Sequence, residues 1–288
     1  MERALTLRKT ILLDGATGTY LARLGFQGMT PELACLSHPE LVEKVYQDYA
    51  TAGAWVILTN TFGANAFRLT KKGLADQLEK INTIASQLAN QVKQRYNHLL
   101  IAGDIGPTGE LIEPLGSLKA DQARKCFRQQ AEILAKCGVD FLLLETFSDL
   151  NEAVLAWEAI RDISSRAVVV SFSLSQGRDY RTMMGQSLSE IISWAEKAEL
   201  PALGFNCGLG SSQMSELASQ VKKMTKIPLW FKPNAGLPVL KEGKTVYPET
   251  PEEFAANCQR IVTSGASFIG GCCGTGPEHI AALAHLLA

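Results

Sequence analysis

The stretch Ala266-Ser267-Phe268-Ile269-Gly270-Gly271-Cys272-Cys273, near the end of the chain, decides the predicted fold. Apolar residues run into two glycines and two neighbouring cysteines, which is typical of a buried strand that ends at a functional edge. Seven similar runs precede it, and all eight begin roughly 25 to 45 residues apart. The seven are residues 10–16, 55–62, 99–107, 141–147, 167–174, 203–208 and 228–236.

Amphipathic stretches such as residues 41–49 and 123–137 lie between these runs. Apolar strands that alternate with helices indicate a parallel sheet covered by helices. Eight such units predict a (β/α)8 barrel of the TIM type, formed by residues 1–288 as a single domain. A doubly wound open sheet is the alternative, but it more often has a glycine-rich phosphate loop after its first strand. The stretch Asp14-Gly15-Ala16-Thr17-Gly18-Thr19 does not match that loop.

Polar residues gather where the predicted strands end. In a barrel these ends converge on one face, which carries the active site. We therefore expect carboxylates, amides and thiols to lie close together at the face of the barrel where the strands end. The residues at these ends are Asp14, Thr59, Asn60, Asp104, Glu145, Ser171, Asn206, Cys207, Asn234, Cys272 and Cys273.

Cys207, Cys272 and Cys273 are the candidate metal ligands and catalytic residues. Three sulfur ligands suit zinc, and three protein ligands leave a fourth position open for a substrate. A disulfide between the neighbouring pair is disfavoured, because adjacent Cα atoms lie about 3.8 Å apart and disulfides span roughly 4.4–6.8 Å. A buried cysteine is often only a small apolar residue. We interpret Cys126, Cys137 and Cys258 in this way because they lie in helical patterns, and Cys35 also lacks a ligand-like setting.

Composition excludes several classes of protein. The 288 residues carry a net charge of −1 without a basic run, which argues against a nucleic-acid partner. No segment approaches the ~18 apolar residues of a membrane span, and the N-terminus does not resemble a secretory signal. Seven cysteines, an odd number, fit reduced thiols in the cytoplasm.

The predicted site favours alkylation of a thiol. Zinc bound by three thiolates is a poor Lewis acid, but it can hold an incoming thiol, of ordinary pKa about 8.5, as a thiolate. Zinc hydrolysis is the alternative, although hydrolytic sites more often use His or carboxylate ligands. Asp14, Asp104 and Glu145 suit an ammonium group, and the turn after Asp14 suits a carboxylate. These features together fit an amino acid that bears a thiol.

At this point the chain resembles the homocysteine S-methyltransferases, most closely the homocysteine-binding module of cobalamin-dependent methionine synthase. The resemblance runs in order along the whole chain, with no departure at a ligand position. Its motifs are residues 13–19 (LDGATGT), 59–62 (TNTF), 103–109 (GDIGPTG), 145–149 (ETFSD), 206–207 (NC), 233–236 (PNAG) and 270–274 (GGCCG).

The resemblance implies a (β/α)8 barrel that binds Zn2+ through Cys207, Cys272 and Cys273. It implies that the homocysteine sulfur takes the fourth position and attacks a methyl group to give methionine. It also implies that Asn234 fills this position without substrate, and that Glu145 and Asp104 hold the substrate amino group. Asp14, Gly15 and Thr61 match residues of the same substrate pocket.

The resemblance leaves the methyl donor open. The chain ends soon after its last helix, so we expect either methylcobalamin on a separate corrinoid protein or a small donor such as S-methylmethionine. Betaine is a further alternative, and it would favour aromatic residues such as Phe62, Phe147 and Trp230 around its ammonium group. Methylation of a different thiol, and a sensor or store that binds zinc and thiols without turnover, are the remaining alternatives.

Overall fold

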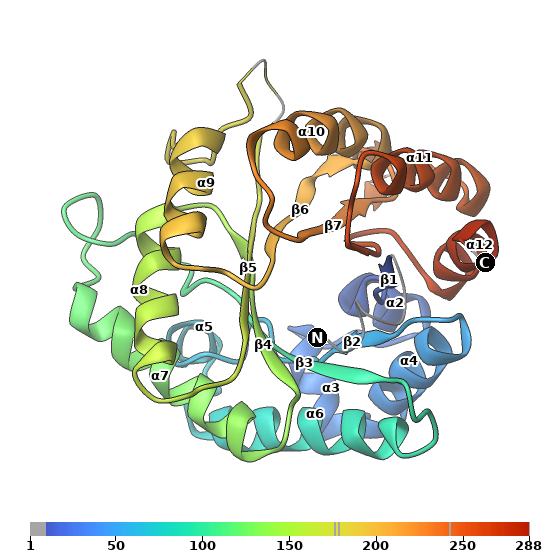
Figure 1. Cartoon of the computed structure of the whole chain (residues 1–288). Helices are drawn as coiled ribbons and strands as arrows, with labels where there is room; N and C mark the ends of the chain where they lie inside the picture. Colours follow the sequence, from blue (N-terminus) through green and yellow to red (C-terminus); the bar gives the residue numbers. More distant parts are fainter. Residues whose placement is uncertain (1–9, 176, 178, 242, 288) are drawn as a thin grey trace.

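The computed structural model describes residues 10–287, with the exception of 176, 178 and 242. Eight parallel strands surround a central axis, and helices cover them on the outside (Figure 1). The strand order is β1-β10-β7-β6-β5-β4-β3-β2. The strands are β1 (Ile11–Leu12), β2 (Val56–Leu58), β3 (Leu100–Ile105), β4 (Phe141–Phe147), β5 (Val168–Phe172), β6 (Leu203–Gly210), β7 (Leu229–Asn234) and β10 (Phe268–Ile269).

The two edge strands meet, so the sheet closes on itself. Leu13 forms a parallel bridge with Val56, and the Trp55 amide donates to the Leu12 carbonyl at 2.7 Å. Each of the eight runs identified in the sequence coincides with one strand of this barrel, although β6 extends beyond its run to Gly210. The predicted (β/α)8 fold is therefore confirmed.

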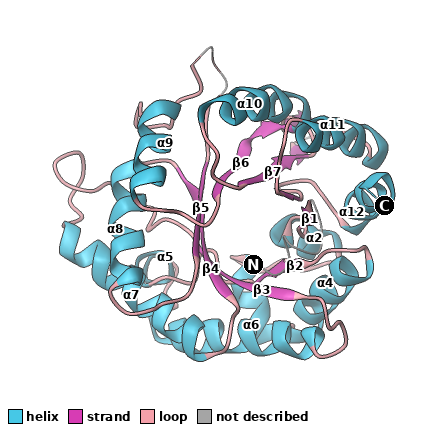
Figure 2. Ribbon diagram, in the orientation of Figure 1, coloured by secondary structure: helices cyan, strands magenta, loops and turns pink. Residues whose placement is uncertain are grey.

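Helices form the outer layer (Figure 2). Those of the outer ring are α4 (Pro39–Thr51), α6 (Leu78–Lys93), α7 (Ala120–Lys136), α8 (Leu150–Arg161), α9 (Leu188–Lys197), α10 (Ser211–Met224), α11 (Pro251–Thr263) and α12 (Pro277–Leu287). Shorter helices follow the first two strands: α2 (Thr17–Arg23), η1 (Pro31–Leu33), α3 (Ala34–Ser37), α5 (Ala66–Lys71) and η2 (Ala75–Gln77). No helix in the described part of the chain is long and apolar enough to cross a membrane.

Sequence signals explain where several helices begin. Ser187 and Glu190 form a capping box at the start of α9, and Thr250 and Glu253 form another at the start of α11. In each box the side chains satisfy backbone amides that lack a partner within the helix. These caps therefore fix the point at which the chain turns from a loop on the barrel face into an outer helix.

The barrel interior is filled by its own apolar cluster, separate from the core between sheet and helices. Its members include Ile11, Leu13, Val56, Leu58, Ala102, Phe141, Leu143, Val169, Trp230 and Phe268. Side chains two residues apart on a strand point to the same face. The next inward positions are therefore Asp104 after Ala102, Glu145 after Leu143 and Lys232 after Trp230. The interior thus changes from apolar to charged toward the carboxyl ends of the strands.

One element of the C-terminal face was not predicted. A two-stranded antiparallel hairpin, β8 (Val239–Lys241) and β9 (Lys244–Val246), follows β7. Its strands are short, and Val239 and Leu240 are exposed rather than alternating with buried positions. The period-2 pattern that marks a half-buried strand is therefore absent here.

Candidate metal and substrate site

Three cysteines meet at the carboxyl ends of the last strands. Cys207 lies within β6, and Cys272 and Cys273 follow β10. The backbone of β7 aligns the pair, because the Cys272 amide donates to the Pro233 carbonyl at 2.7 Å and the Cys273 carbonyl accepts from the Ala235 amide at 3.0 Å. The three sulfur atoms lie within 4.8 Å of one another.

The spacing of these sulfurs suits a tetrahedral metal ion. The Sγ atoms of Cys207 and Cys273 are 4.0 Å apart. Two sulfurs that bind one zinc ion at ~2.3 Å with tetrahedral geometry lie about 3.8 Å apart. All three cysteines are free thiols. The donor set and its dimensions therefore fit zinc.

Hydrogen bonding within the cluster stabilises a thiolate. Bonds from Cys207 and Cys272 lower the pKa of Cys273 to about 3, against the opposing effect of burial. Metal binding requires deprotonated cysteines. The cluster therefore favours the ionised form of the Cys273 sulfur, which is the form that binds a metal ion.

Asn206 connects the cysteines to the neighbouring strands. Its Oδ1 atom accepts from the Thr146 amide at 3.1 Å and from the Ser171 hydroxyl at 2.6 Å. Its Nδ2 atom donates to the Thr146 hydroxyl at 2.6 Å and approaches the Cys272 sulfur at 3.9 Å. Such contacts orient ligands and offset the charge of thiolates. Sequence reasoning placed Asn206 and Ser171 at this face but missed Thr146.

The backbone is left-handed at two of these positions. Cys207 has a φ of 56° and Thr146 has a φ of 62°. A β-branched residue such as Thr rarely adopts this conformation, and such strain clusters at functional sites. The two hydrogen bonds between Thr146 and Asn206, one donated by each residue, hold Thr146 in this conformation.

The glycine before the cysteine pair permits close packing. A Cβ atom on Gly271 would lie 2.4 Å from the Thr275 hydroxyl oxygen. That hydroxyl donates to the Cys272 carbonyl at 2.7 Å and accepts from the Ala16 amide at 3.1 Å. Gly271 thus allows Thr275 to tie the cysteine loop to the turn after β1.

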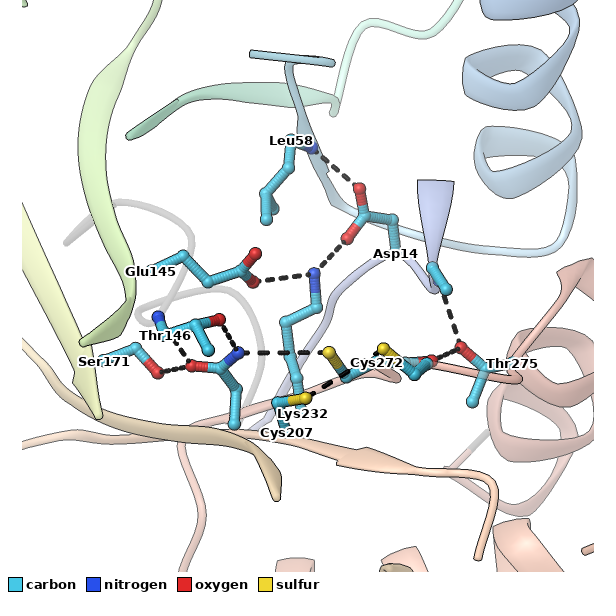
Figure 3. A network of polar contacts seen from close by, with 12 residues as sticks. Asp14, Leu58, Glu145, Thr146, Ser171, Cys207, Lys232, Cys272 and Thr275 are labelled. Atoms are coloured by element: carbon cyan, nitrogen blue, oxygen red, sulfur yellow. Dashed lines mark hydrogen bonds and ion pairs between the residues drawn. The ribbon is translucent and has the colours of Figure 1, made fainter. Parts of the chain in front are cut away.

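Lys232, which sequence reasoning did not single out, lies between two of the predicted carboxylates (Figure 3). Its Nζ atom is 2.8 Å from Asp14 and 3.5 Å from Glu145, and its side chain is only 3% exposed. Burial disfavours the charged amine, but Asp14 and Glu145 hold the pKa of Lys232 above its usual range. The sequence did contain a signal for a buried lysine, because Lys232 lies within an otherwise largely apolar strand.

This ion pair changes the expected role of Asp14. Its second oxygen accepts from the Leu58 amide at 2.8 Å, so both oxygens have protein partners. Asp14 is 1% exposed and is not part of the cavity wall. The geometry therefore makes Asp14 a support for Lys232 rather than a free partner for a substrate ammonium group.

Asp104 and Glu145 have the unused acceptors that Asp14 lacks. Asp104 Oδ1 and Glu145 Oε1 are buried without a hydrogen-bond partner among the described residues, although Glu145 Oε1 lies 3.5 Å from the Lys232 ammonium group. Burial, followed by repulsion from Glu145, raises the pKa of Asp104 well above its usual range, and burial also raises the pKa of Glu145. A buried carboxylate without a partner is costly, so this pair suits a cationic ligand that donates several hydrogen bonds.

The other predicted residues have distinct places. The Thr61 hydroxyl donates to the Asp104 carbonyl at 2.6 Å, so Thr61 positions a neighbour as well as lining the cavity. The side-chain oxygen of Asn234 is buried and forms no hydrogen bond to any residue that the structure describes. It lies between Pro233 and Ala235, whose backbones pair with the cysteines. Gly15 lines the cavity and packs against Tyr49 and Thr275.

These groups share one cavity of about 520 Å³. Seven of the predicted residues line it, namely Gly15, Thr61, Asp104, Glu145, Cys207, Cys272 and Cys273. Asp14 and Asn234 lie behind its surface. The aromatic cage considered for betaine is not formed, because Phe147 and Trp230 are fully buried in the cores. The cavity therefore places thiols, carboxylates and a buried lysine around one small ligand.

The chain is similar to known proteins along nearly its whole length. A family model described as homocysteine S-methyltransferase matches residues 11–287. Methionine synthase of Mycobacterium leprae (strain TN) is 30% identical over 98% of this chain, and that of Mycobacterium tuberculosis (strain ATCC 25618 / H37Rv) is 29% identical over the same share. The chain spans about a quarter of the length of either relative.

A solved structure has the same architecture. The homocysteine methyltransferase MmuM from Escherichia coli, in its oxidized form, is 25% identical, with a TM-score of 0.82 over 99% of this chain and 98% of that one. Its metallated form, at 24% identity and a TM-score of 0.83, shows the likeness of fold. The similarity to both groups of proteins covers the whole barrel.

Proposed function

Because the chain belongs to the homocysteine S-methyltransferase family, we propose that this site transfers a methyl group to the thiol of homocysteine and releases methionine. We propose further that residues 1–288 act as one homocysteine-binding module and that the resident metal ion is Zn2+. The observation that carries the proposal is the set of three sulfurs within 4.8 Å beside two buried carboxylates, each with an oxygen that makes no hydrogen bond to the described residues.

Asp104 and Glu145 recognise the amino group of the substrate. An ammonium group has hydrogen-bond donors but no acceptors, which complements the free oxygens of these two side chains. Lys232 lies 3.5 Å from this oxygen of Glu145 and forms a closer ion pair with Asp14, at 2.8 Å. We infer that the turn from Gly15 to Thr19, which lines the same cavity, faces the substrate carboxylate.

Cys207, Cys272 and Cys273 would hold the metal ion. Zinc bound in this way supplies one further coordination position, at which a thiol loses its proton near neutral pH. The unpartnered oxygen of Asn234, beside the cysteine loop, suits this position when homocysteine is absent. Asn206 supports the arrangement through its contact with the Cys272 sulfur.

The donor set favours transfer over hydrolysis. Catalytic zinc sites that activate water use His or carboxylate ligands, often in combination. Here the ligand cluster found among the described residues contains only cysteines. Three thiolates leave a zinc ion with a net negative charge, which disfavours attack by hydroxide but leaves a bound sulfur electron-rich. The chemistry of the donor set therefore supports S-alkylation.

A turnover assay tests the proposal. Zinc-loaded protein is mixed with homocysteine and, in separate reactions, with methylcobalamin, S-methylmethionine, betaine or methyltetrahydrofolate. We expect methionine to form with at least one donor, and we expect betaine to be poor because the aromatic cage is not formed. Cysteine replaces homocysteine in the control. Absence of methionine with every donor, while zinc and homocysteine both bind, would favour a thiol sensor instead.

A further inference from the structure

One buried ammonium group is shared unequally by two buried carboxylates (Figure 3). The Nζ atom of Lys232 lies 2.8 Å from Asp14 Oδ1 but 3.5 Å from Glu145 Oε1. Only the contact with Asp14 has the length of a charge-assisted hydrogen bond. Opposite charges attract more strongly in a protein interior than in water. The position of Lys232 therefore decides how much of the Glu145 charge remains available to a ligand.

The backbone around Asp14 fixes its carboxylate behind the cavity. The Asp14 amide donates to the Val56 carbonyl at 3.1 Å, and the Asp14 carbonyl accepts from the Gly271 amide at 3.0 Å. Its Oδ2 atom accepts from the Leu58 amide at 2.8 Å, which leaves Oδ1 for Lys232. Asp14 cannot move toward the cavity without losing these bonds, so it holds the ammonium group toward the back of the site.

Lys232 and Glu145 both line the cavity, whereas Asp14 does not. A lysine carries its ammonium group, with three donors, on a flexible stem. A movement of Nζ toward Glu145 would therefore turn the 3.5 Å contact into a direct ion pair. That ion pair would occupy Glu145 Oε1, the atom without a hydrogen-bond partner among the described residues. The contact with Asp14 opposes this movement.

From this geometry we propose that Asp14 is a positioning residue for homocysteine, which holds the Lys232 ammonium group away from Glu145 and so leaves Glu145 free to bind the substrate amino group. The inference rests on the proposed binding of homocysteine at this site. It gives Asp14 an indirect role in recognition, in place of the direct contact with an ammonium group that its place at a strand end suggested.

Asp14→Asn tests this role. The Leu58 amide and the Lys232 ammonium group approach different oxygens of Asp14, and an Asn side chain has an acceptor at only one of these positions. Lys232 should then close on Glu145. We expect homocysteine affinity to fall about 10-fold, the lower end for loss of a hydrogen bond to a charged group. The KM for homocysteine should rise in parallel, with little change in kcat.

The loss should depend on the amino group of the substrate. 4-Mercaptobutyrate has the thiol and the carboxylate of homocysteine but lacks the amino group. Its affinity should not fall in Asp14→Asn. Calorimetric titration of the zinc-loaded variant with each thiol measures both affinities, and metal analysis shows whether the sulfur cluster is intact. A general disturbance of the cavity would instead weaken both thiols equally, which would contradict the proposed role.

A double variant separates an indirect role of Asp14 from a direct one. In Asp14→Asn/Lys232→Met no ammonium group remains to close on Glu145, so homocysteine affinity should recover most of the loss. Removing both members of a buried ion pair is also less costly than leaving one charge unpaired. The double variant is therefore decisive even if Asp14→Asn does not fold. Direct contact between Asp14 and the substrate amino group predicts weak binding in both variants.

Asp140→Asn is the matched control. Asp140 likewise pairs with a lysine, Lys93, at 2.6 Å and accepts from a strand amide, that of Ile101, at 2.6 Å. It precedes β4, at the opposite end of the barrel, and does not line the cavity. Its substitution removes a comparable ion pair and should leave the affinities for both thiols unchanged.

The outcomes for this inference and for the proposed function are distinct. Weaker homocysteine binding in Asp14→Asn, with recovery in the double variant, would support the positioning role. Unchanged affinity in Asp14→Asn, an equal loss in Asp140→Asn, or a double variant that binds as weakly as Asp14→Asn would overturn it. If the unaltered protein binds homocysteine but forms no methionine with any donor, the proposed transfer fails, while the affinities of the variants still decide the role of Asp14.

Discussion

Alanine at Cys207, Cys272 or Cys273 is expected to lower zinc affinity by more than about 100-fold, which exceeds the usual cost of losing a residue that only supports a metal ligand. Each substitution removes one of the three sulfurs that lie within 4.8 Å of one another. Two thiolates cannot retain the ion against a competing chelator, so methionine formation should fall with the zinc content. Chelator competition and metal analysis of the purified variants measure the loss.

Cys258→Ala is the matched control for these three variants. Cys258 is fully buried in α11 and belongs to the core between sheet and helices. Its loss removes a sulfur and creates a small cavity, but it removes no member of the cluster. Retention of zinc in Cys258→Ala and loss in the other three would support the assignment. Stoichiometric, tightly bound zinc in all four variants would show that the metal lies elsewhere.

The second large effect is expected at the carboxylates that face the substrate amino group. Glu145→Gln or Asp104→Asn should weaken homocysteine binding about 10- to 150-fold, because a charge-assisted hydrogen bond contributes roughly 1.5–3 kcal/mol. Zinc affinity should change much less, since neither side chain is part of the sulfur cluster. Calorimetric titration of zinc-loaded variants with homocysteine measures both the affinity and the number of sites.

Glu152→Gln provides the control for a buried carboxylate. Glu152 is also buried, but it bonds Thr108 and does not line the cavity. The Glu152→Gln variant should therefore bind homocysteine with the affinity of the unaltered protein. A second comparison uses 4-mercaptobutyrate, which is homocysteine without the amino group: its binding should be insensitive to Glu145→Gln. Equal losses for both thiols would mean that Glu145 shapes the cavity without recognising the ammonium group.

Most of the barrel could be predicted because its strands are apolar and regularly spaced. Each predicted run coincides with one strand of the barrel. The β8–β9 hairpin escaped detection because its side chains are largely exposed. Pattern reasoning depends on burial, so it identifies the core of the barrel better than elements on its rim.

The site was only partly predictable, because its electrostatics depend on distances between strands. The sequence placed Asp14, Asp104 and Glu145 at one face but could not show that Lys232 engages the first of them. The alternation of Trp230 and Lys232 along β7 would have indicated an inward lysine. The role of Thr146 depends on a left-handed backbone and on a bond from Asn206, and neither has a sequence signal.

The measurement that most directly tests the account is X-ray absorption at the zinc edge, with and without saturating homocysteine. Without substrate, the zinc shell should contain three sulfurs and one oxygen or nitrogen, consistent with the cysteine cluster and a nearby acceptor such as Asn234. With homocysteine, we expect four sulfurs at about 2.3 Å. A shell that keeps three sulfurs at saturating homocysteine would contradict direct activation of the thiol by the metal, even if methionine is still formed.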